Sequence, residues 1–221
     1  MTDLHPAPLP PLIDAQALQD LLGEPSLRLF DTTVHLRPKP GGGYEIASGR
    51  EDYEAAHLPG AGFIDLWHEL ADPGHALRFM LPPEALFAAR LGAHGVGPGT
   101  RVVLYNAGPT WWATRAWFML REFGFDAVQV LDGGLDQWKL EGRPLDARPC
   151  AYPPTRFVPG PRRGIFVGKE AVLEAVQRRD RHLVHALSPA LFSGRVVGYG
   201  RPGRIAGSVN LPAVDLSLIH I

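Results

Sequence analysis

The 221-residue sequence contains very little cysteine. Cys150 is the only one, so an internal disulfide framework is excluded and any thiol chemistry must use that side chain. A single cysteine also fits a reducing compartment. Cys150 lies in a proline-rich stretch with no helix start beside it, so we interpret it as a structural or incidental thiol and not as a nucleophile.

Long apolar runs and an excess of one charge are also absent. No window approaches the ~18 apolar residues of a membrane span, and residues 1–12 are proline-rich without the apolar core of a signal peptide. A net charge of −1 gives no electrostatic reason to expect a nucleic-acid or anionic-membrane partner. We therefore predict a cytoplasmic protein without nucleic-acid or membrane partners.

One motif occurs twice. Residues 57–61, HLPGA, correspond to residues 204–208, RIAGS, and the offset between His57 and Arg204 is 147 residues. Each copy is preceded by the same two elements, a helical pattern and then an apolar run typical of a buried strand: residues 12–18 and 27–31 in the first copy, 167–173 and 182–187 in the second. The sequence therefore predicts a tandem repeat of one domain.

The first copy continues as an α/β domain. Apolar strand patterns alternate with helical patterns along it: strands at 63–66, 101–105 and 127–131, helices at 82–91 and 111–123. This alternation requires crossover connections and predicts a parallel sheet flanked by helices. Residues 37–48 contain three consecutive glycines, and we expect an exposed loop there.

Prolines mark the end of the first copy. Six of them lie between Gly142 and Arg163, too many missing amide donors for a regular element. We therefore predict an N-terminal domain at residues 10–146, a proline-rich linker at 147–163 and an incomplete second domain at 164–221.

The ordered motifs resemble the two-domain rhodanese-type sulfurtransferases. The motifs that carry the resemblance are HLPGA with Asp65, residues 79–82 (FMLP), residues 115–117 (RAW), residues 123–124 (FG), and residues 131–134 (LDGG) with Trp138. The resemblance implies a rhodanese-like α/β fold followed by a second copy truncated before its catalytic loop. It also implies transfer of a sulfane sulfur from thiosulfate or 3-mercaptopyruvate to cyanide or a thiol, through a cysteine persulfide in the second domain and without a cofactor.

A persulfide requires a thiolate, which is favoured where a tight loop of backbone amides meets a helix N-terminus. In the first copy this loop is 106–110, NAGPT, which contains no sulfur, and Pro109 removes one amide. The repeat offset puts the loop of the second copy near position 253, beyond Ile221. We therefore expect no catalytic residue within these 221 residues and predict that the chain by itself is inactive.

Arginine is the side chain suited to hold the anionic sulfur donor, because its guanidinium presents a planar fork to carboxylate or sulfonate oxygens. The resemblance assigns Arg195 to this substrate-binding role, with Arg201 as a second candidate. No metal site is expected: His182 and His185 are three residues apart on a predicted strand, so their side chains point to opposite faces.

Three questions stay open at the level of the sequence. One concerns function, because a non-catalytic rhodanese-like module used for binding or regulation is the alternative to the enzyme. Another concerns the donor, thiosulfate or 3-mercaptopyruvate. The last concerns residues 216–221, LSLIHI, which depart from the family and resemble translated sequencing-library end sequence. We expect the truncation to be an artefact, and re-sequencing the locus tests this.

Overall fold

The computed structural model describes residues 9–39, 43–198 and 200–217. The chain divides into two compact units. The first comprises Met1–His35 and Ile46–Ile165, and the second comprises Leu36–Glu45 and Phe166–Ile221.

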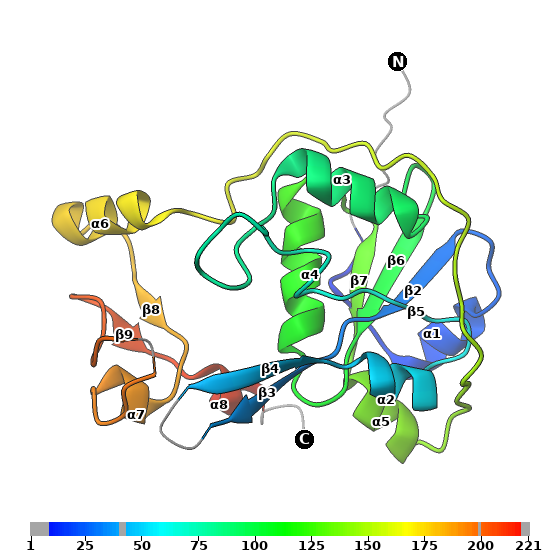
Figure 1. Ribbon diagram of the computed structural model, residues 1–221, viewed down its shortest axis with the longest axis horizontal. Coiled ribbons are helices and arrows are strands. Elements are labelled where there is room, and N and C mark those ends of the chain that lie inside the picture. Colours follow the sequence, from blue (N-terminus) through cyan, green and yellow to red (C-terminus); the bar gives the residue numbers. More distant parts are fainter. Residues whose placement is uncertain (1–8, 40–42, 199, 218–221) are drawn as a thin grey trace. The chain divides into compact units, whose positions relative to one another are not determined.

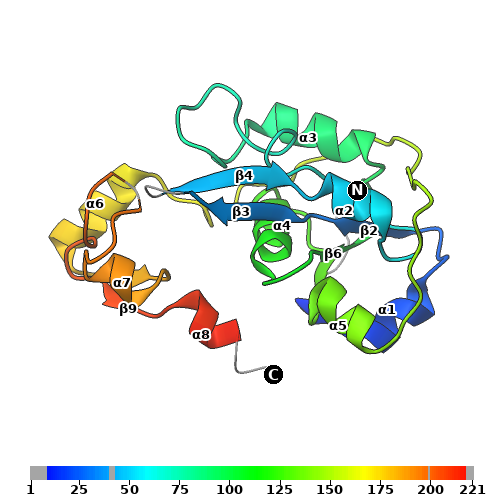
Figure 2. The ribbon, with the colours of Figure 1, turned by 60° about the horizontal axis from the view of Figure 1, so that its bottom comes forward.

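The first unit is built on a five-stranded parallel sheet with the strand order β1-β7-β6-β2-β5. Its strands, in chain order, are β1 (Leu12–Ile13), β2 (Leu27–Asp31), β5 (Gly62–Phe63), β6 (Arg101–Tyr105) and β7 (Val128–Leu131). Its helices are α1 (Ala15–Leu21), α2 (Arg50–Ala55), α3 (Glu84–Ala93), α4 (Trp111–Glu122) and α5 (Gly134–Leu140). The predicted α/β fold with a parallel sheet flanked by helices is confirmed (Figure 1 and Figure 2).

Alternating residues of the central strands explain the two-sided core. Leu27 and Leu29 of β2 join one buried cluster with side chains of α1, α2 and α5, among them Leu18 and Trp138. Phe30, the next residue along β2, is equally buried but lies outside that cluster, as expected when successive strand residues face opposite sides. Helix α4 packs against β6 and β7. The sheet is therefore buried on both faces, as parallel sheets usually are.

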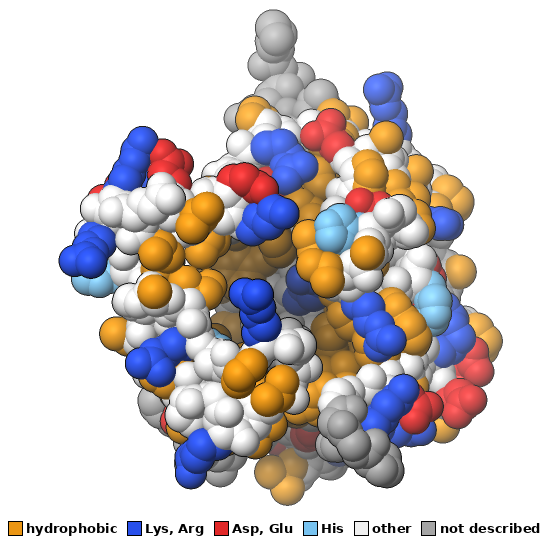
Figure 3. Space-filling model, turned by 60° about the vertical axis from the view of Figure 1, so that its left-hand side comes forward, with side chains coloured by type: hydrophobic (Ala, Val, Ile, Leu, Met, Phe, Trp, Pro, Cys, Tyr) orange, Lys and Arg blue, Asp and Glu red, His pale blue; other side chains and the backbone are white. Residues whose placement is uncertain are grey.

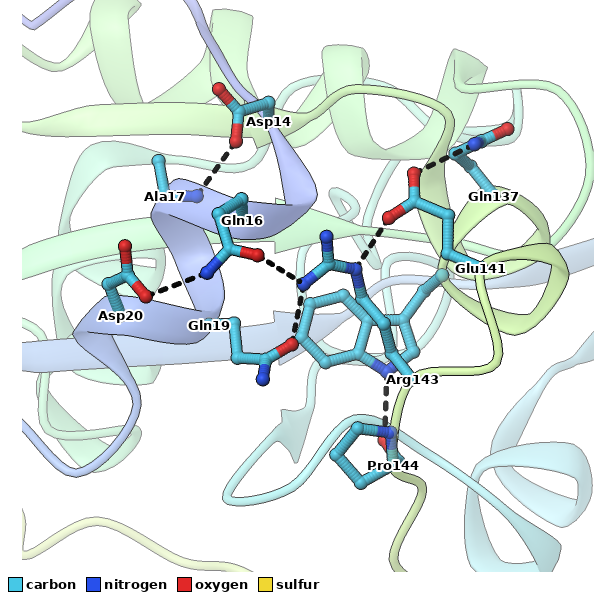
Figure 4. Close-up of polar contacts among 10 residues, drawn as sticks. Asp14, Gln16, Ala17, Gln19, Asp20, Gln137, Glu141, Arg143 and Pro144 are labelled. Carbon is cyan, nitrogen blue, oxygen red and sulfur yellow. Dashed lines mark hydrogen bonds and ion pairs between the residues drawn. The ribbon is translucent and has the colours of Figure 1, made fainter.

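Helices α1 and α5 are joined by polar contacts around Arg143 (Figure 4). Its guanidinium donates to Glu141 and to the side-chain oxygen atoms of Gln16 and Gln19. Asp14 caps α1 by accepting a 2.7 Å hydrogen bond from the amide of Ala17. The sequence predicts a helix from residue 12, but Leu12–Ile13 forms strand β1, which pairs with β7.

The exposed loop predicted at residues 37–48 is wrong in part. These residues do not form a loop throughout, because β3 (Val34–Pro38) and β4 (Tyr44–Ser48) make a separate two-stranded sheet. Of the three glycines that suggested a loop, Gly43 has a positive φ of 78° and lies in the connection, and the other two lie outside the described residues. The flanking alternation of Val34, Leu36, Tyr44 and Ile46 was the strand signal.

Residues 146–165, called the strap below, contain no helix or longer strand among described residues, yet they lie against the first unit. The strap begins with a bridge between His57 and Asp146, whose backbone groups exchange two 2.8 Å hydrogen bonds. Further along, Phe157 is only 4% exposed and packs against Phe87 and Phe125. The strap is therefore part of the core of the first unit.

Two glycines of the first unit allow the backbone of the strap to approach closely, because they have no side chain. A Cβ added to Gly92 would lie 2.6 Å from the carbonyl oxygen of Thr155, and one added to Gly124 would lie 2.6 Å from Cα of Gly160. Ion pairs hold the far end, where Arg162 contacts the buried carboxylate of Glu122 at 2.6 Å. Any larger side chain at these glycines would displace the strap backbone.

The second unit contains α6 (Lys169–Arg178), β8 (Val184–His185), α7 (Pro189–Phe192), β9 (Val209–Asn210) and α8 (Ala213–Ser217). The parallel pair β8–β9 has the register Val184 with Val209 and His185 with Asn210. The matching pair in the first unit, β2–β5, has Phe30 with Gly62 and Asp31 with Phe63. The two units therefore share the same strand pairing.

Local geometry agrees with this correspondence. Gly60 and Gly207 both have positive φ, 75° and 78°. The amide of Ile64 donates to Asp31 O at 2.9 Å, and the amide of Leu211 donates to His185 O at 3.1 Å. The segment around the repeated motif thus folds in the same way in both units.

The units differ in burial. In the first unit, β2 is buried along nearly its whole length, whereas Val184 of β8 and Val209 of β9 are 53% and 58% exposed. Other apolar side chains of the second unit are exposed as well, including Leu173 and Val167. Figure 3 shows hydrophobic side chains at the surface among Lys and Arg side chains.

Candidate functional site

The loop at residues 106–110 lies at the carboxyl edge of the first unit's sheet. It joins the end of β6 to the first turn of α4. Ligand sites of parallel sheets form at this edge, and the first amides of a helix favour an anion. This loop is therefore the candidate site of the first unit.

Side chains of the protein already bond the backbone of this loop. The Gly108 amide donates a 2.9 Å hydrogen bond to the Asp136 carboxylate, which comes from the first turn of α5. The Ala107 amide donates to Thr33 Oγ1 at 3.0 Å. Pro109 has no amide hydrogen to offer. A substrate anion would have to displace Asp136, which bears the same charge.

Asn106 fixes the shape of the loop from inside. Its side chain is fully buried, and its Nδ2 donates to the carbonyl oxygen atoms of Ala107 and Pro109 at 2.7 and 2.8 Å. Its Oδ1 accepts a 3.0 Å bond from the amide of Ala113 in the first turn of α4. Asn106 thus provides hydrogen-bond partners for two carbonyl groups of the loop and for an amide in the first turn of α4.

Asp31 supports the loop from the end of β2. Its Oδ1 accepts hydrogen bonds from the Thr33 amide at 2.8 Å and the Thr33 hydroxyl at 2.5 Å. Burial raises the pKa of Asp31 to about 6, although the two bonds from Thr33 act in the opposite direction. The Thr33 hydroxyl oxygen also accepts a hydrogen bond from the Ala107 amide. Asp31, Thr33 and Ala107 therefore link β2 to the loop.

Sequence reasoning missed Asp136 and Thr33 as loop partners. Thr33 comes two residues after a strand end, and Asp136 belongs to the first turn of a helix that begins at the second of two consecutive glycines. A polar residue at either place is a signal for the carboxyl edge of a parallel sheet. Which backbone group each one bonds depends on the tertiary structure.

The two predicted substrate arginines lie on one loop of the second unit. Both side chains are exposed, and Arg195 Nε contacts Ser193 Oγ at 3.3 Å. The loop closes on itself, because a Cβ at Gly194 would lie 3.1 Å from the nitrogen of Gly203. Arg195 and Arg201 therefore belong to the same closed loop.

His185 stands in the second unit where Asp31 stands in the first. Its ring packs edge-on against Phe192 with the ring centroids 5.5 Å apart, and its Nε2 is buried without a hydrogen-bond partner among the described residues. Leu187, at the position of Thr33, is 41% exposed. The polar support that Asp31 and Thr33 give their loop is therefore not reproduced by these residue types.

Cys150 belongs to the strap and is partly buried. Burial raises the pKa of its thiol, which disfavours the thiolate that nucleophilic chemistry needs. In the described ranges, no cluster of three or more His, Cys, Asp or Glu side chains could bind a metal ion. Within the same residues, every helix is too short or too polar to cross a membrane.

Comparison with known proteins places these features in a family. The rhodanese-like domain matches residues 14–141. The chain is 33% identical over 198 residues to mouse thiosulfate sulfurtransferase, covering 86% of this chain and 64% of that protein. It is 32% identical over 213 residues to human 3-mercaptopyruvate sulfurtransferase, covering 92% and 69%. The chain thus spans about two thirds of the length of these relatives.

Solved structures show the same fold. The crystal structure of SseA from Escherichia coli, described as a 3-mercaptopyruvate sulfotransferase with the rhodanese fold, matches with a TM-score of 0.79 at 27% identity, covering 91% of this chain and 74% of that one. The Tum1 protein of Saccharomyces cerevisiae matches with a TM-score of 0.75 at 19% identity, covering 91% and 69%. The chain belongs to the rhodanese-like domain family.

Proposed function

We propose that this chain is part of a sulfurtransferase that moves a sulfane sulfur from thiosulfate or 3-mercaptopyruvate to cyanide or a thiol. The names of its relatives support this activity. The proposal places the nucleophilic cysteine in the second domain, on the loop that corresponds to residues 106–110 of the first. A thiolate there would attack the outer sulfur of thiosulfate, breaking the S–S bond and releasing sulfite, or the sulfur of 3-mercaptopyruvate, breaking the C–S bond and releasing the enolate of pyruvate, which takes up a proton. Either attack leaves a cysteine persulfide.

We further propose that the 221-residue chain has no sulfur-transfer activity of its own. The observation that carries this proposal is the loop at residues 106–110, whose Gly108 amide is bonded by Asp136 and which contains no sulfur. The one cysteine, Cys150, is outside that loop and has a thiol pKa raised by burial. Neither feature supports a persulfide at pH 7.

Arg195 and Arg201 are proposed to hold the anionic donor. Both are exposed side chains of one closed loop, and a guanidinium fork suits the oxygen atoms of thiosulfate or of a carboxylate. This role requires the rest of the second domain, so Arg195→Ala is to be tested in a longer protein that contains it. We expect a higher KM for the donor and an unchanged KM for cyanide.

The test of inactivity is thiocyanate formation by the purified 221-residue chain with thiosulfate and cyanide. We expect no turnover above a heat-killed control. The Cys150→Ser variant is the matched control, because turnover that this substitution abolishes would show that Cys150 is a nucleophile after all. Turnover of either protein contradicts the proposal of an inactive chain.

The alternative is a non-catalytic rhodanese-like module for binding or regulation. The observation in its favour is the replacement of Asp31 and Thr33 by His185 and Leu187 in the second unit. Re-sequencing the locus separates the two proposals. A cysteine-headed loop near position 253 supports the enzyme, and its absence from an intact reading frame supports the module.

A further inference from the structure

His57 is a fully buried histidine whose two ring nitrogen atoms both face carbonyl oxygen atoms. Nδ1 lies 2.6 Å from the carbonyl oxygen of Tyr53, and Nε2 lies 3.2 Å from that of Arg148 in the strap. A carbonyl oxygen only accepts, so each contact is a hydrogen bond only when the nitrogen carries a hydrogen. The neutral ring has a hydrogen on one nitrogen, and the imidazolium has one on both. Both bonds therefore form only with the imidazolium.

The end of α2 favours a positive charge at this place. Tyr53 belongs to the last turn of α2, and the His57 amide, which would bond Tyr53 O in a longer helix, donates to Asp146 O instead. The ring thus bonds a carbonyl group left over at the C-terminus of a helix, where the helix dipole stabilises cations. It also stacks on the Tyr53 ring, with the centroids 4.1 Å apart, which fixes its plane.

Two further observations favour a cation here. Burial raises the pKa of Asp31 to about 6, and the charge of His57 acts in the opposite direction, as a cation does near a carboxylate. In the second copy of the repeated motif, Arg204 stands at the position of His57. Arginine is always charged and only donates, so the second copy has no neutral form at this position.

The other ionisable groups around the ring keep their charge near neutral pH. Burial raises the pKa of the Tyr53 and Tyr105 hydroxyls and of the Cys150 thiol, so these groups stay neutral. On the strap, Asp146 and Arg148 form an ion pair at 2.7 Å. On α2, Arg50 contacts the carboxylate of Glu69 at 3.7 Å. Among the described groups, Asp31 is therefore the neighbour whose charge changes with the pH in this range.

We propose that His57 is a pH-sensitive switch that holds the first part of the strap against α2. With a hydrogen on both nitrogens, the ring bonds Tyr53 O and Arg148 O at once. When the ring gives one proton to water, one carbonyl oxygen faces a nitrogen lone pair. We expect the Arg148 bond to break, because the bond to Tyr53 is shorter and lies within the same segment. The strap is thus held at low pH and released as the pH rises.

This switch is separate from the proposed sulfur transfer, because it needs no part of the second domain. Its consequence is local. The backbone bridge between His57 and Asp146 lies beside the ring, and the Cys150 amide donates to the Tyr53 hydroxyl at 3.5 Å. Release of Arg148 should therefore loosen the bridge and uncover Cys150.

The first experiment is an NMR titration of the ¹⁵N-labelled 221-residue chain from about pH 5.5 to about pH 9. At low pH we expect a directly bonded, slowly exchanging hydrogen on both ring nitrogens of His57. As the pH rises, Nε2 should lose its hydrogen, and the amide signals of His57 and Asp146 should shift with the same midpoint. The ring of His68, whose side chain is 62% exposed, is the internal control, and its titration should leave these amides unchanged.

The second experiment uses Cys150, the only thiol of the chain. His57→Gln keeps one donor in place of two, and the wild type and this variant are alkylated side by side at each pH. At about pH 6 we expect the wild type to react about tenfold more slowly than His57→Gln, as expected for one charged hydrogen bond. At about pH 9 the two rates should be equal. Asp31→Asn is the control, and the chain with this substitution should keep the same pH dependence.

Four results would overturn the proposal. A single ring N–H signal of His57 at every pH would show that the ring is neutral throughout. Two such signals up to about pH 9 would show a permanent contact and not a switch. Loss of the Nε2 hydrogen without a shift of the His57 and Asp146 amides would show that the strap stays bound. Equal alkylation of the wild type and His57→Gln at about pH 6 would show that the ring does not hold the strap.

Discussion

The two units contain corresponding elements: a helix, a parallel strand pair and a turn at the repeated motif. They differ in how much of the rest of the protein covers these elements. In the first unit β2 lies between β5 and β6, and the strap adds Tyr152 and Phe157. In the second unit the pair β8–β9 forms a sheet of two strands with exposed apolar side chains. The comparison shows that equal local structure does not imply equal burial.

This difference bears on stability. Apolar surface stabilises a fold when it leaves water, by about 25 cal/mol per Å². Leu29 is 1% exposed, whereas its counterpart Leu183 is only partly buried. The same residue type at the same place therefore contributes different amounts to the two units.

The largest effect is expected at the strap. Phe157→Ala removes a ring packed between Phe87 and Phe125, and the cavity should lower the free energy of unfolding of the first unit by about 3–5 kcal/mol. Urea unfolding followed by tryptophan fluorescence measures this, because all five tryptophans belong to that unit. Val167→Ala, at a side chain 58% exposed, is the control with an expected change under about 0.5 kcal/mol. Equal effects would show that the strap is not packed.

Leu29→Ala and Leu183→Ala compare the two copies directly. We expect a loss of about 2–5 kcal/mol for Leu29→Ala by tryptophan fluorescence, because that side chain is fully enclosed. For Leu183→Ala we expect under about 1 kcal/mol, measured by hydrogen exchange of the Val209 amide, which bonds Leu183 O at 2.9 Å. A large loss at Leu183 would mean that the second unit has a core like that of the first.

Asp31 gives the first unit a pH dependence. Its pKa is about 6 in the folded state and about 3.8 unfolded, so the folded state binds the proton more tightly and stability falls as pH rises from about 4 to about 6. Asp31→Asn should abolish this loss, which is roughly 3 kcal/mol. Urea unfolding at pH 4.5 and pH 7 should show about 2 kcal/mol of this loss, because the rest of it lies below pH 4.5. Asp20→Asn at an exposed site is the control. A slope that persists in Asp31→Asn would refute this assignment.

The smallest effect is expected at Asp136. Asp136→Ala releases the Gly108 amide, which should exchange its hydrogen faster, while the free energy of unfolding changes by under about 1 kcal/mol because the bond is exposed. Asp132→Ala, at another exposed aspartate near the start of α5, is the control and should leave Gly108 unchanged. Unaltered hydrogen exchange of the Gly108 amide in Asp136→Ala would mean that Asp136 does not bond that amide.

Local patterns predicted most elements of the fold. Strand β6 spans the five predicted residues, 101–105, and α4 ends one residue before the predicted Phe123. A short apolar run indicates a strand buried on both faces, and a 3.6-residue period indicates a helix. The strands β3 and β4 were missed, since the glycine run between them suggested a loop although the apolar residues on either side of it alternate. The short strand β1 was missed because its two residues pair only through tertiary contact with β7.

The candidate site was predictable in position and not in detail. The end of β6 followed by a helix start locates the loop at residues 106–110, and the absence of sulfur there is visible in the sequence. That Asp136 bonds Gly108 was not visible, because the two residues are 28 positions apart and meet only at the carboxyl edge of the sheet. Arg195 and Arg201 stay predictions, although one closed loop contains both.

The sequence by itself determined the family, the duplication of the motif and the single cysteine, since each depends only on residue type and spacing. Tertiary structure alone decided that a proline-rich segment is part of a core and that its Tyr152 hydroxyl bonds the backbone of Leu29 and Gly60. The physical reason is that burial, hydrogen bonding and charge depend on neighbours brought together from distant parts of the chain, and spacing along one segment does not specify them.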